Sequence, residues 1–180
     1  VISGCGGDDG GPVSLKWFIA IQPGGSIQKV AADCSAQSGG KYDIDLELLP
    51  TDASQQREQL VRRLGAEDSS IDLIGMDVVW TAEFANAGWI QEFKGKEKQE
   101  VSKDVFPPVL KTATFENKLY GAPFNSNTQL LWYRKDLVPK PPTTWDQMID
   151  MAEEMGPDDG GQIQVQSNRY EGFTAWTNAM

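Results

Sequence analysis

Two polar residues, Asp77 and Gln22, follow strand-like segments at points where an α/β fold places ligand-binding groups. Asp77 comes directly after the apolar segment 71–76, and Gln22 lies in the loop after the alternating segment 13–19. In open α/β sheets ligands bind outside the carboxyl ends of the strands, so both residues are expected at one sheet edge. A carboxylate and an amide at such an edge can hydrogen-bond to ligand hydroxyl groups. Asp77 also has a purely structural interpretation, as a helix N-cap.

The composition disfavours most enzymatic and nucleic-acid-binding functions. The sequence contains no His, which removes the usual general base and a usual zinc ligand. Its net charge is -10 and its 16 Lys and Arg residues are scattered, whereas phosphate binding needs clustered cations. We therefore expect no catalytic residue, metal, cofactor or nucleic-acid partner. A carboxylate pair such as Asp77 and Glu83 leaves a carbohydrate-active hydrolase as the alternative.

The first twelve residues have the features of a lipid-attachment site followed by a tether. Cys5 is preceded by small residues at two positions and by an aliphatic residue at the third, the pattern of a bacterial lipobox. Residues 1–4 are interpreted as a signal-peptide remnant. Residues 5–12 are interpreted as the lipidated Cys5 and a flexible, Gly-rich tether. The alternative is that Cys5 is an ordinary residue of a terminal segment.

From Val13 onward the pattern alternates between strands and helices, which is typical of an α/β domain with a largely parallel sheet. The expected strands are 13–19, 42–49, 71–76, 119–124, 128–133 and 162–166. The expected helices are 26–39, 52–65, 78–88, 109–115, 143–155 and 173–180. Segments 119–124 and 128–133 could form a hairpin, or one extended path between two lobes. Cys34 is expected to be a buried small side chain of the first helix.

Three sequence blocks occur in a fixed order behind the lipobox, at 72–89, 118–123 and 127–137. Together they resemble the family 1 extracellular solute-binding proteins, the sugar-binding subunits of ABC importers. The likeness spans about residues 13 to 180. Within that family, residues 77–84 and 127–133 are most similar to the trehalose-binding lipoproteins of actinobacteria.

The resemblance implies the two-lobe α/β fold of periplasmic binding proteins, with a ligand cleft between the lobes. Residues 13–126 are then expected to form the first lobe. Residues 127–180 are expected to be a crossing strand and the start of the second lobe, which is incomplete because members of the family are much longer.

The resemblance also implies site residues. Asp77 and Asn127 match positions expected to hold sugar hydroxyls, although Asn127 could instead be a hinge or turn residue. Asn125 lies on the same crossing segment, and Trp80 is the tryptophan expected to offer a flat face to the ligand. Gln22 is added to the set only because its loop follows the first expected strand, and the adjacent Pro23 departs from the polar residue expected in trehalose binders.

The expected function is capture of a disaccharide, with trehalose favoured, and its delivery to ABC permease subunits in the membrane. The protein is expected to be a monomer that carries out no chemistry. Its expected location is extracytoplasmic, with the lipid on Cys5 as its membrane anchor. An oligosaccharide or a polyol is the alternative ligand on the same scaffold, and a structural or adhesive role without a small ligand is the other alternative.

Overall fold

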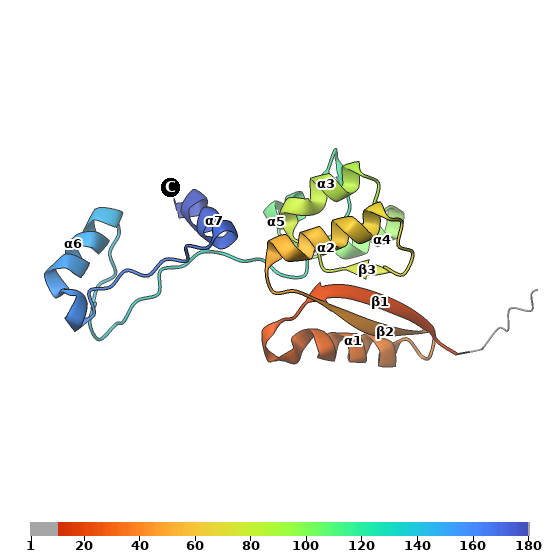
Figure 1. Ribbon diagram of the computed structural model, residues 1–180, viewed down its shortest axis with the longest axis horizontal. Coiled ribbons are helices and arrows are strands. Elements are labelled where there is room, and N and C mark those ends of the chain that lie inside the picture. The colour runs from red at the N-terminus through yellow and green to blue at the C-terminus, as the bar shows by residue number, and fades with distance from the viewer. Residues whose placement is uncertain (1–10, 180) are drawn as a thin grey trace, which may run out of the picture. The chain divides into compact units, whose positions relative to one another are not determined.

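The computed structural model describes residues 11–179 of the chain. These residues divide into two compact units, an N-terminal unit ending at Phe124 and a C-terminal unit beginning at Asn125 (Figure 1). The proposed lipid site at Cys5 lies outside the described residues. Within them, no helix has the length and apolar character needed to cross a membrane.

A three-stranded parallel sheet organises the N-terminal unit. Its strand order is β2-β1-β3, with β1 at Val13–Ala20, β2 at Tyr42–Leu49 and β3 at Leu73–Ile74. The expected strands 13–19 and 42–49 are confirmed, because period-2 alternation is a strong local signal. The regular part of β3 is shorter than the expected 71–76.

Helices cover both faces of this sheet. Helix α1, Ser26–Gln37, lies on one face, and α2, Ala53–Gly65, lies on the other (Figure 1). Helix α2 begins where Asp52 accepts a hydrogen bond from the backbone N of Gln55 at 2.9 Å, an N-cap that satisfies an otherwise unpaired donor. Cys34 is half-buried on α1 with a free thiol, rather than fully buried.

The main core lies between the sheet and the α2 face. Its buried residues are Phe18, Leu49, Leu60, Trp80 and Phe84. Leu60 and Phe84 are completely buried. Burying side chains of this size stabilises the fold by about 1.5–3 kcal/mol each. Because Trp80 belongs to this core, the segment after β3 is anchored in the same core as the sheet.

The rest of the N-terminal unit is built from short elements. These are η2 at Val78–Trp80, α3 at Thr81–Asn86, α4 at Gly95–Ser102, α5 at Pro107–Thr112, β4 at Thr114–Phe115 and β5 at Lys118–Leu119. Strands β4 and β5 form an antiparallel hairpin, whose turn residues Glu116 and Asn117 have φ of 47° and 64°. Positive φ at both positions is the signature of a type I′ turn. The hairpin therefore closes at residues 116–117. Of the two alternatives for segments 119–124 and 128–133, the hairpin is not formed, because residues 120–133 contain no strand.

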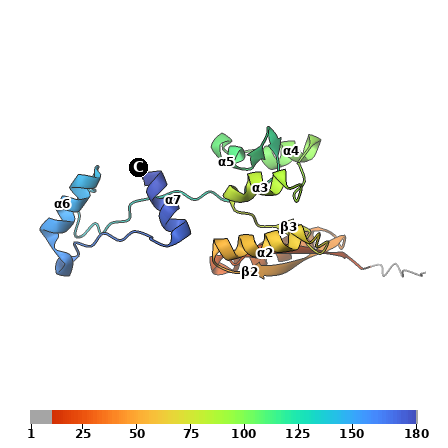
Figure 2. The same cartoon turned by 45° about the horizontal axis from the view of Figure 1, so that its top comes forward.

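The C-terminal unit contains helices joined by long irregular segments. Helix α6 is Trp145–Met155, with Thr144 as its N-cap, a short η3 turn follows at Pro157–Asp159, and α7 is Arg169–Ala179. Figure 2 shows no strand arrows between these helices. The expected strands 128–133 and 162–166 are wrong within the described residues, where neither segment has a partner. A strand needs a neighbour to complete its ladder of hydrogen bonds.

Candidate ligand-binding site

Polar residues gather where the three parallel strands end. The strands run side by side in register, with Ala20 of β1 opposite Leu49 of β2, and Phe18 of β1 opposite Ile74 of β3. The chain therefore leaves all three strands at one edge of the sheet, which we call the carboxyl edge. The polar residues that follow the strands there are Gln22, Thr51, Asp52 and Asp77. In this fold class, ligands bind outside such an edge.

Asp77 is half-buried, lies three residues after the end of β3, and caps the η2 turn. Its side chain accepts a hydrogen bond from the backbone N of Val79 at 3.4 Å. Its carbonyl oxygen accepts another from the backbone N of Trp80 at 3.1 Å. A carboxylate has about four acceptor positions, so capping and ligand binding can coexist. The structure shows the capping role, and the ligand role stays a prediction.

Trp80 belongs to the core and not to the surface of the site. It is 3% exposed, and its ring stacks on that of Phe84 with centroids 6.0 Å apart. The expectation that this ring offers a flat face to a ligand is therefore not supported. Trp80 instead anchors the segment that carries Asp77. The exposed apolar side chains beside Asp77 are aliphatic, with Val78 56% and Val79 61% exposed.

Gln22 lies in the loop that leaves β1, just before the η1 turn at Pro23–Gly25. The side chain is half-buried, and its Nε2 donates to the carbonyl oxygen of Ala20 at 3.4 Å. This long hydrogen bond is weak, so the amide can exchange it for a ligand group at small cost. The structure thus places Gln22 at the same sheet edge as Asp77, as the sequence predicts.

The carboxyl end of β2 adds polar groups that the sequence analysis missed. Asp52 caps α2 at this edge, beside Thr51. Gln56, only 9% exposed, directs its Nε2 to the carbonyl oxygen of Thr51 at 3.4 Å. The sequence analysis placed ligand groups after the carboxyl ends of the first and third strands, and the same rule applied to β2 would have identified Thr51 and Asp52. Asp52 and Asp77 are two acidic residues at this edge, and among the four polar residues there none is basic.

Glu83 is committed to an ion pair between two helices. Arg57 of α2 donates to Glu83 of α3 through Nε, at 2.8 Å from Oε2, and also through Nη2. This contact raises the pKa of the Arg57 guanidinium, mainly through the hydrogen bond to Glu83. This bidentate contact engages both carboxylate oxygens of Glu83, so Glu83 links α3 to α2. The arrangement gives the hydrolase alternative no support.

Asn125 and Asn127 are exposed residues at the start of the C-terminal unit. They belong to a different unit from Gln22 and Asp77, so their part in a common site stays a prediction. Among the described residues, no group of three or more His, Cys, Asp or Glu side chains could hold a metal ion.

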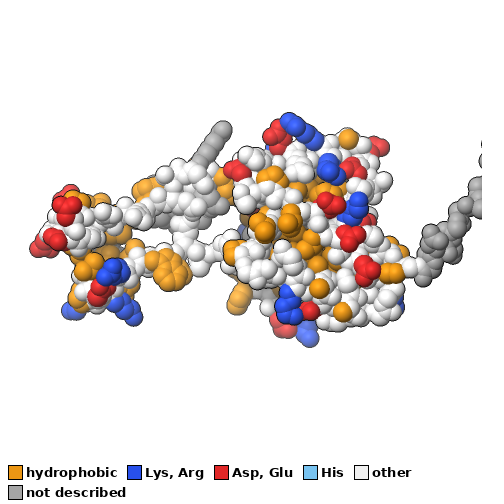
Figure 3. Space-filling view, turned by 60° about the horizontal axis from the view of Figure 1, so that its bottom comes forward, with side chains coloured by type: hydrophobic (Ala, Val, Ile, Leu, Met, Phe, Trp, Pro, Cys, Tyr) orange, Lys and Arg blue, Asp and Glu red, His pale blue; other side chains and the backbone are white. Residues whose placement is uncertain are grey.

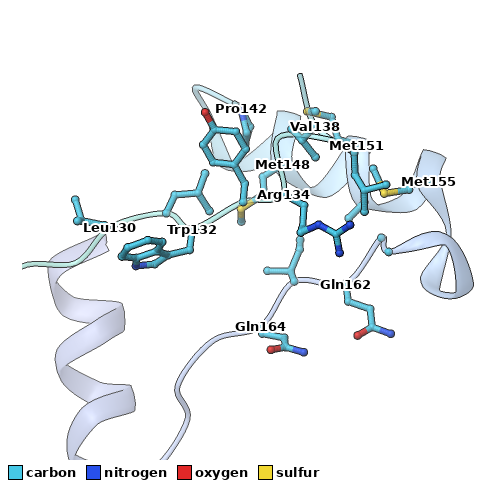
Figure 4. Close-up of a pocket in the computed structure, with 17 residues that line it drawn as sticks. Leu130, Trp132, Arg134, Val138, Pro142, Met148, Met151, Met155, Gln162 and Gln164 are labelled. Atoms are coloured by element: carbon cyan, nitrogen blue, oxygen red, sulfur yellow. The ribbon is translucent and has the colours of Figure 1, made fainter. Parts of the chain in front are cut away.

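A separate hollow of about 430 Å³ lies within the C-terminal unit, between α6 and segments 130–134 and 160–164. Its lining is largely apolar and includes Met148, Met151 and Met155 of α6 together with Leu130 and Trp132 (Figure 4). Figure 3 shows such apolar side chains at the surface of the molecule, and Trp132 is 87% exposed. None of the predicted site residues lines this hollow.

Comparison with known proteins identifies the scaffold. Residues 21–180 match the family described as bacterial extracellular solute-binding proteins. A probable ABC transporter-binding protein of Deinococcus radiodurans is 28% identical over 166 residues, which cover 81% of this chain and 37% of the relative. A mannitol-binding protein of Pseudomonas aeruginosa is 25% identical over 130 residues, which cover 68% of this chain and 30% of the relative.

The fold agrees with this match. An ABC transporter solute-binding protein from Agrobacterium radiobacter K84, solved in complex with ribitol, aligns with a TM-score of 0.67 and 20% identity. The alignment covers 81% of this chain and 38% of that one. The chain thus spans well under half the length of these relatives, and its fold is part of a periplasmic-binding-protein fold. The chain belongs to the bacterial extracellular solute-binding protein family.

Proposed function

We propose that the full-length protein is the substrate-binding component of an ABC importer that captures a neutral, hydroxyl-rich solute. The observation that carries this proposal is the carboxyl edge, where Gln22 and Asp77 follow neighbouring parallel strands in a chain of this family. Asp and Gln side chains can pair with ligand hydroxyls, and family membership supports delivery to permease subunits.

The proposed ligand class is a sugar or a sugar alcohol. The P. aeruginosa relative is named as a mannitol-binding protein, and the A. radiobacter structure contains ribitol. The negative charge of Asp52 and Asp77 disfavours anionic solutes at this edge. The similarity of residues 77–84 and 127–133 to trehalose binders makes trehalose our first choice among disaccharides.

The proposed ligand-binding residues fall into two groups along the chain. Gln22 and Asp77 bind from the N-terminal unit, and Asn125 and Asn127 bind from the segment that leads out of it. Exclusion of water from the bound ligand strengthens the few polar contacts, and capture involves no covalent chemistry. The protein acts as a monomer outside the cytoplasm.

Calorimetric titration of the full-length protein tests the ligand class. The panel is trehalose, maltose, mannitol and ribitol, with citrate as an anionic control. We expect saturable binding of at least one neutral compound and none of citrate. Recovery of the intact ligand after incubation separates binding from hydrolysis. Absence of binding to every neutral compound contradicts the proposal, and cleavage of a disaccharide favours the hydrolase.

The lipid anchor on Cys5 is a separate part of the proposal. It rests on the lipobox pattern before Cys5 and on the Gly-rich tether that follows. Growth of producing bacteria with a radiolabelled fatty acid should label the full-length protein, and Cys5→Ser should abolish the label. The matched control is Cys34→Ser, because Cys34 lies on α1 and should leave labelling unchanged.

A further inference from the structure

We infer that Gly75 is a positioning residue for Asp77, because it lets the chain leave β3 in close contact with β1. The inference rests on the proposed function, in which Asp77 binds a ligand hydroxyl. It concerns the backbone between β3 and Asp77, a segment to which neither the family nor the relatives assign a role.

The space around Gly75 is closed by Ile19 of β1. A Cβ built on Gly75 would lie 2.8 Å from Ile19 Cδ1, 2.9 Å from its Cβ and closer still to its Cγ1. Ile19 is 2% exposed, so its side chain is enclosed by the protein. The φ of Gly75 is not in the left-handed region, so the requirement for glycine here is one of space alone.

The same close approach makes a strong backbone contact. The backbone N of Gly75 donates to the carbonyl oxygen of Phe18 at 2.7 Å, which completes the last β1–β3 pair, Phe18 with Ile74. Asp77 follows two residues later. Trp80 then fixes the other end of the segment by packing its ring in the core. The path that carries Asp77 is thus held at both ends, by Gly75 against β1 and by Trp80 against Phe84.

Any residue larger than glycine at position 75 must push this path away from β1. Packed interiors respond to such overpacking by shifting side chains and backbone. A shift there displaces the Asp77 carboxylate relative to Gln22, which leaves the sheet from the neighbouring strand β1. The expected consequence is a loss of affinity that is separable from any loss of stability.

The test is a four-protein cycle in the full-length protein: wild type, Gly75→Ala, Ile19→Ala and the double variant. The probe is whichever neutral ligand of the calorimetric panel the wild type binds. We expect the Kd of Gly75→Ala to rise by roughly tenfold, the size of effect expected when a hydrogen bond to a charged group is misplaced. Ile19→Ala should bind like the wild type while melting at a lower temperature.

The double variant distinguishes positioning from a merely structural role. Truncation of Ile19 removes its Cγ1 and Cδ1 and leaves only its Cβ, 2.9 Å from the new Cβ, so the double variant should recover part of the affinity although its core is less well filled. A merely structural role predicts instead that affinity follows melting temperature through the cycle. The matched control is Gly65→Ala, where a new Cβ meets only Trp89 Cζ2 at 3.8 Å, and its Kd should not change.

The outcomes separate this inference from the proposed function. If the wild type binds no ligand of the panel, the proposed function fails. If the wild type binds but folded Gly75→Ala binds equally well, the positioning role is wrong. A double variant that binds no better than Gly75→Ala also overturns it. If Gly75→Ala does not fold, the double variant is used instead. The inference is then overturned if Ile19→Ala folds and binds the ligand but the double variant does not.

Discussion

Arg57 of α2 holds the carboxylate of Glu83 of α3 through Nε and Nη2, across 26 positions of sequence. Both residues lie in the early turns of helices that begin at the carboxyl edge. The pair therefore ties together the two helices that follow β2 and β3. It also gives Glu83 a structural role between these helices.

Glu83→Gln should lower the free energy of unfolding by about 0.2–1 kcal/mol, the range measured for partly exposed ion pairs. The side chains of Arg57 and Glu83 are 44% and 37% exposed, so salt should screen much of the effect. Urea unfolding at low and at high salt measures the loss of unfolding free energy and its dependence on salt. Glu58→Gln is the control, because its pair with Arg62 lies within one helix and is more exposed. Equal losses for the two variants would remove any special role for the Arg57–Glu83 contact.

Asp77→Asn should weaken ligand binding by about 1.5–3 kcal/mol, the contribution of a hydrogen bond to a charged group. Asn is as good an N-cap as Asp, so the η2 turn and the melting temperature should stay nearly unchanged. Calorimetry with the bound ligand of the panel measures the affinity, and differential scanning calorimetry measures the stability. Full affinity in Asp77→Asn would argue that Asp77 is a cap alone.

Asp77→Ala separates the two roles of this residue further. It removes both the ligand acceptor and the cap, so it should bind as weakly as Asp77→Asn and also lose about 1 kcal/mol of stability. Asp52→Asn is the matched control at the same edge, because it preserves the cap of α2 and removes a charge. Its effect on binding tests whether Asp52 also contacts the ligand.

Phe84→Ala should destabilise the protein by about 3–5 kcal/mol, because it empties a fully packed core site. Phe84 is completely buried, stacks on Trp80 and meets Trp89 edge-on with centroids 5.5 Å apart. Phe106→Ala is the control, since Phe106 is 76% exposed and should change stability by no more than about 0.5 kcal/mol. Chemical denaturation measures both. Similar losses for the two variants would contradict the core assigned here.

Local signals explain what the sequence predicted well. The bounds of β2 follow from its alternation of Ile44, Leu46 and Leu48 with acidic residues, and an Asp at position 52 marks the start of α2. Each of these signals lies within a few residues of the element it predicts. The parallel sheet and the carboxyl edge then follow from the order of the elements.

Long-range partners explain what the sequence did not predict. The apolar segments 128–133 and 162–166 have strand composition, but a strand also requires a neighbour, which composition does not reveal. Trp80 was expected at a ligand because tryptophan suits a sugar face, yet its orientation depends on Phe84 and the sheet. The closeness of Gly75 to Ile19 likewise depends on how β3 docks on β1, which no local pattern encodes.

Stability should fall with acidity through Asp68, whose pKa is lowered mainly by hydrogen bonds from the Oγ and backbone N of Ser70 and also by Arg63. A carboxyl with a lowered folded-state pKa stabilises the fold above its ordinary value of 3.8 and loses that contribution as pH falls toward its folded value. Asp68→Asn should therefore be less stable at neutral pH and show a shallower decline below pH 3.8. Urea unfolding at a series of pH values measures this, with exposed Asp43→Asn as the control. An unchanged slope in Asp68→Asn would show that this carboxyl does not contribute to the acid response.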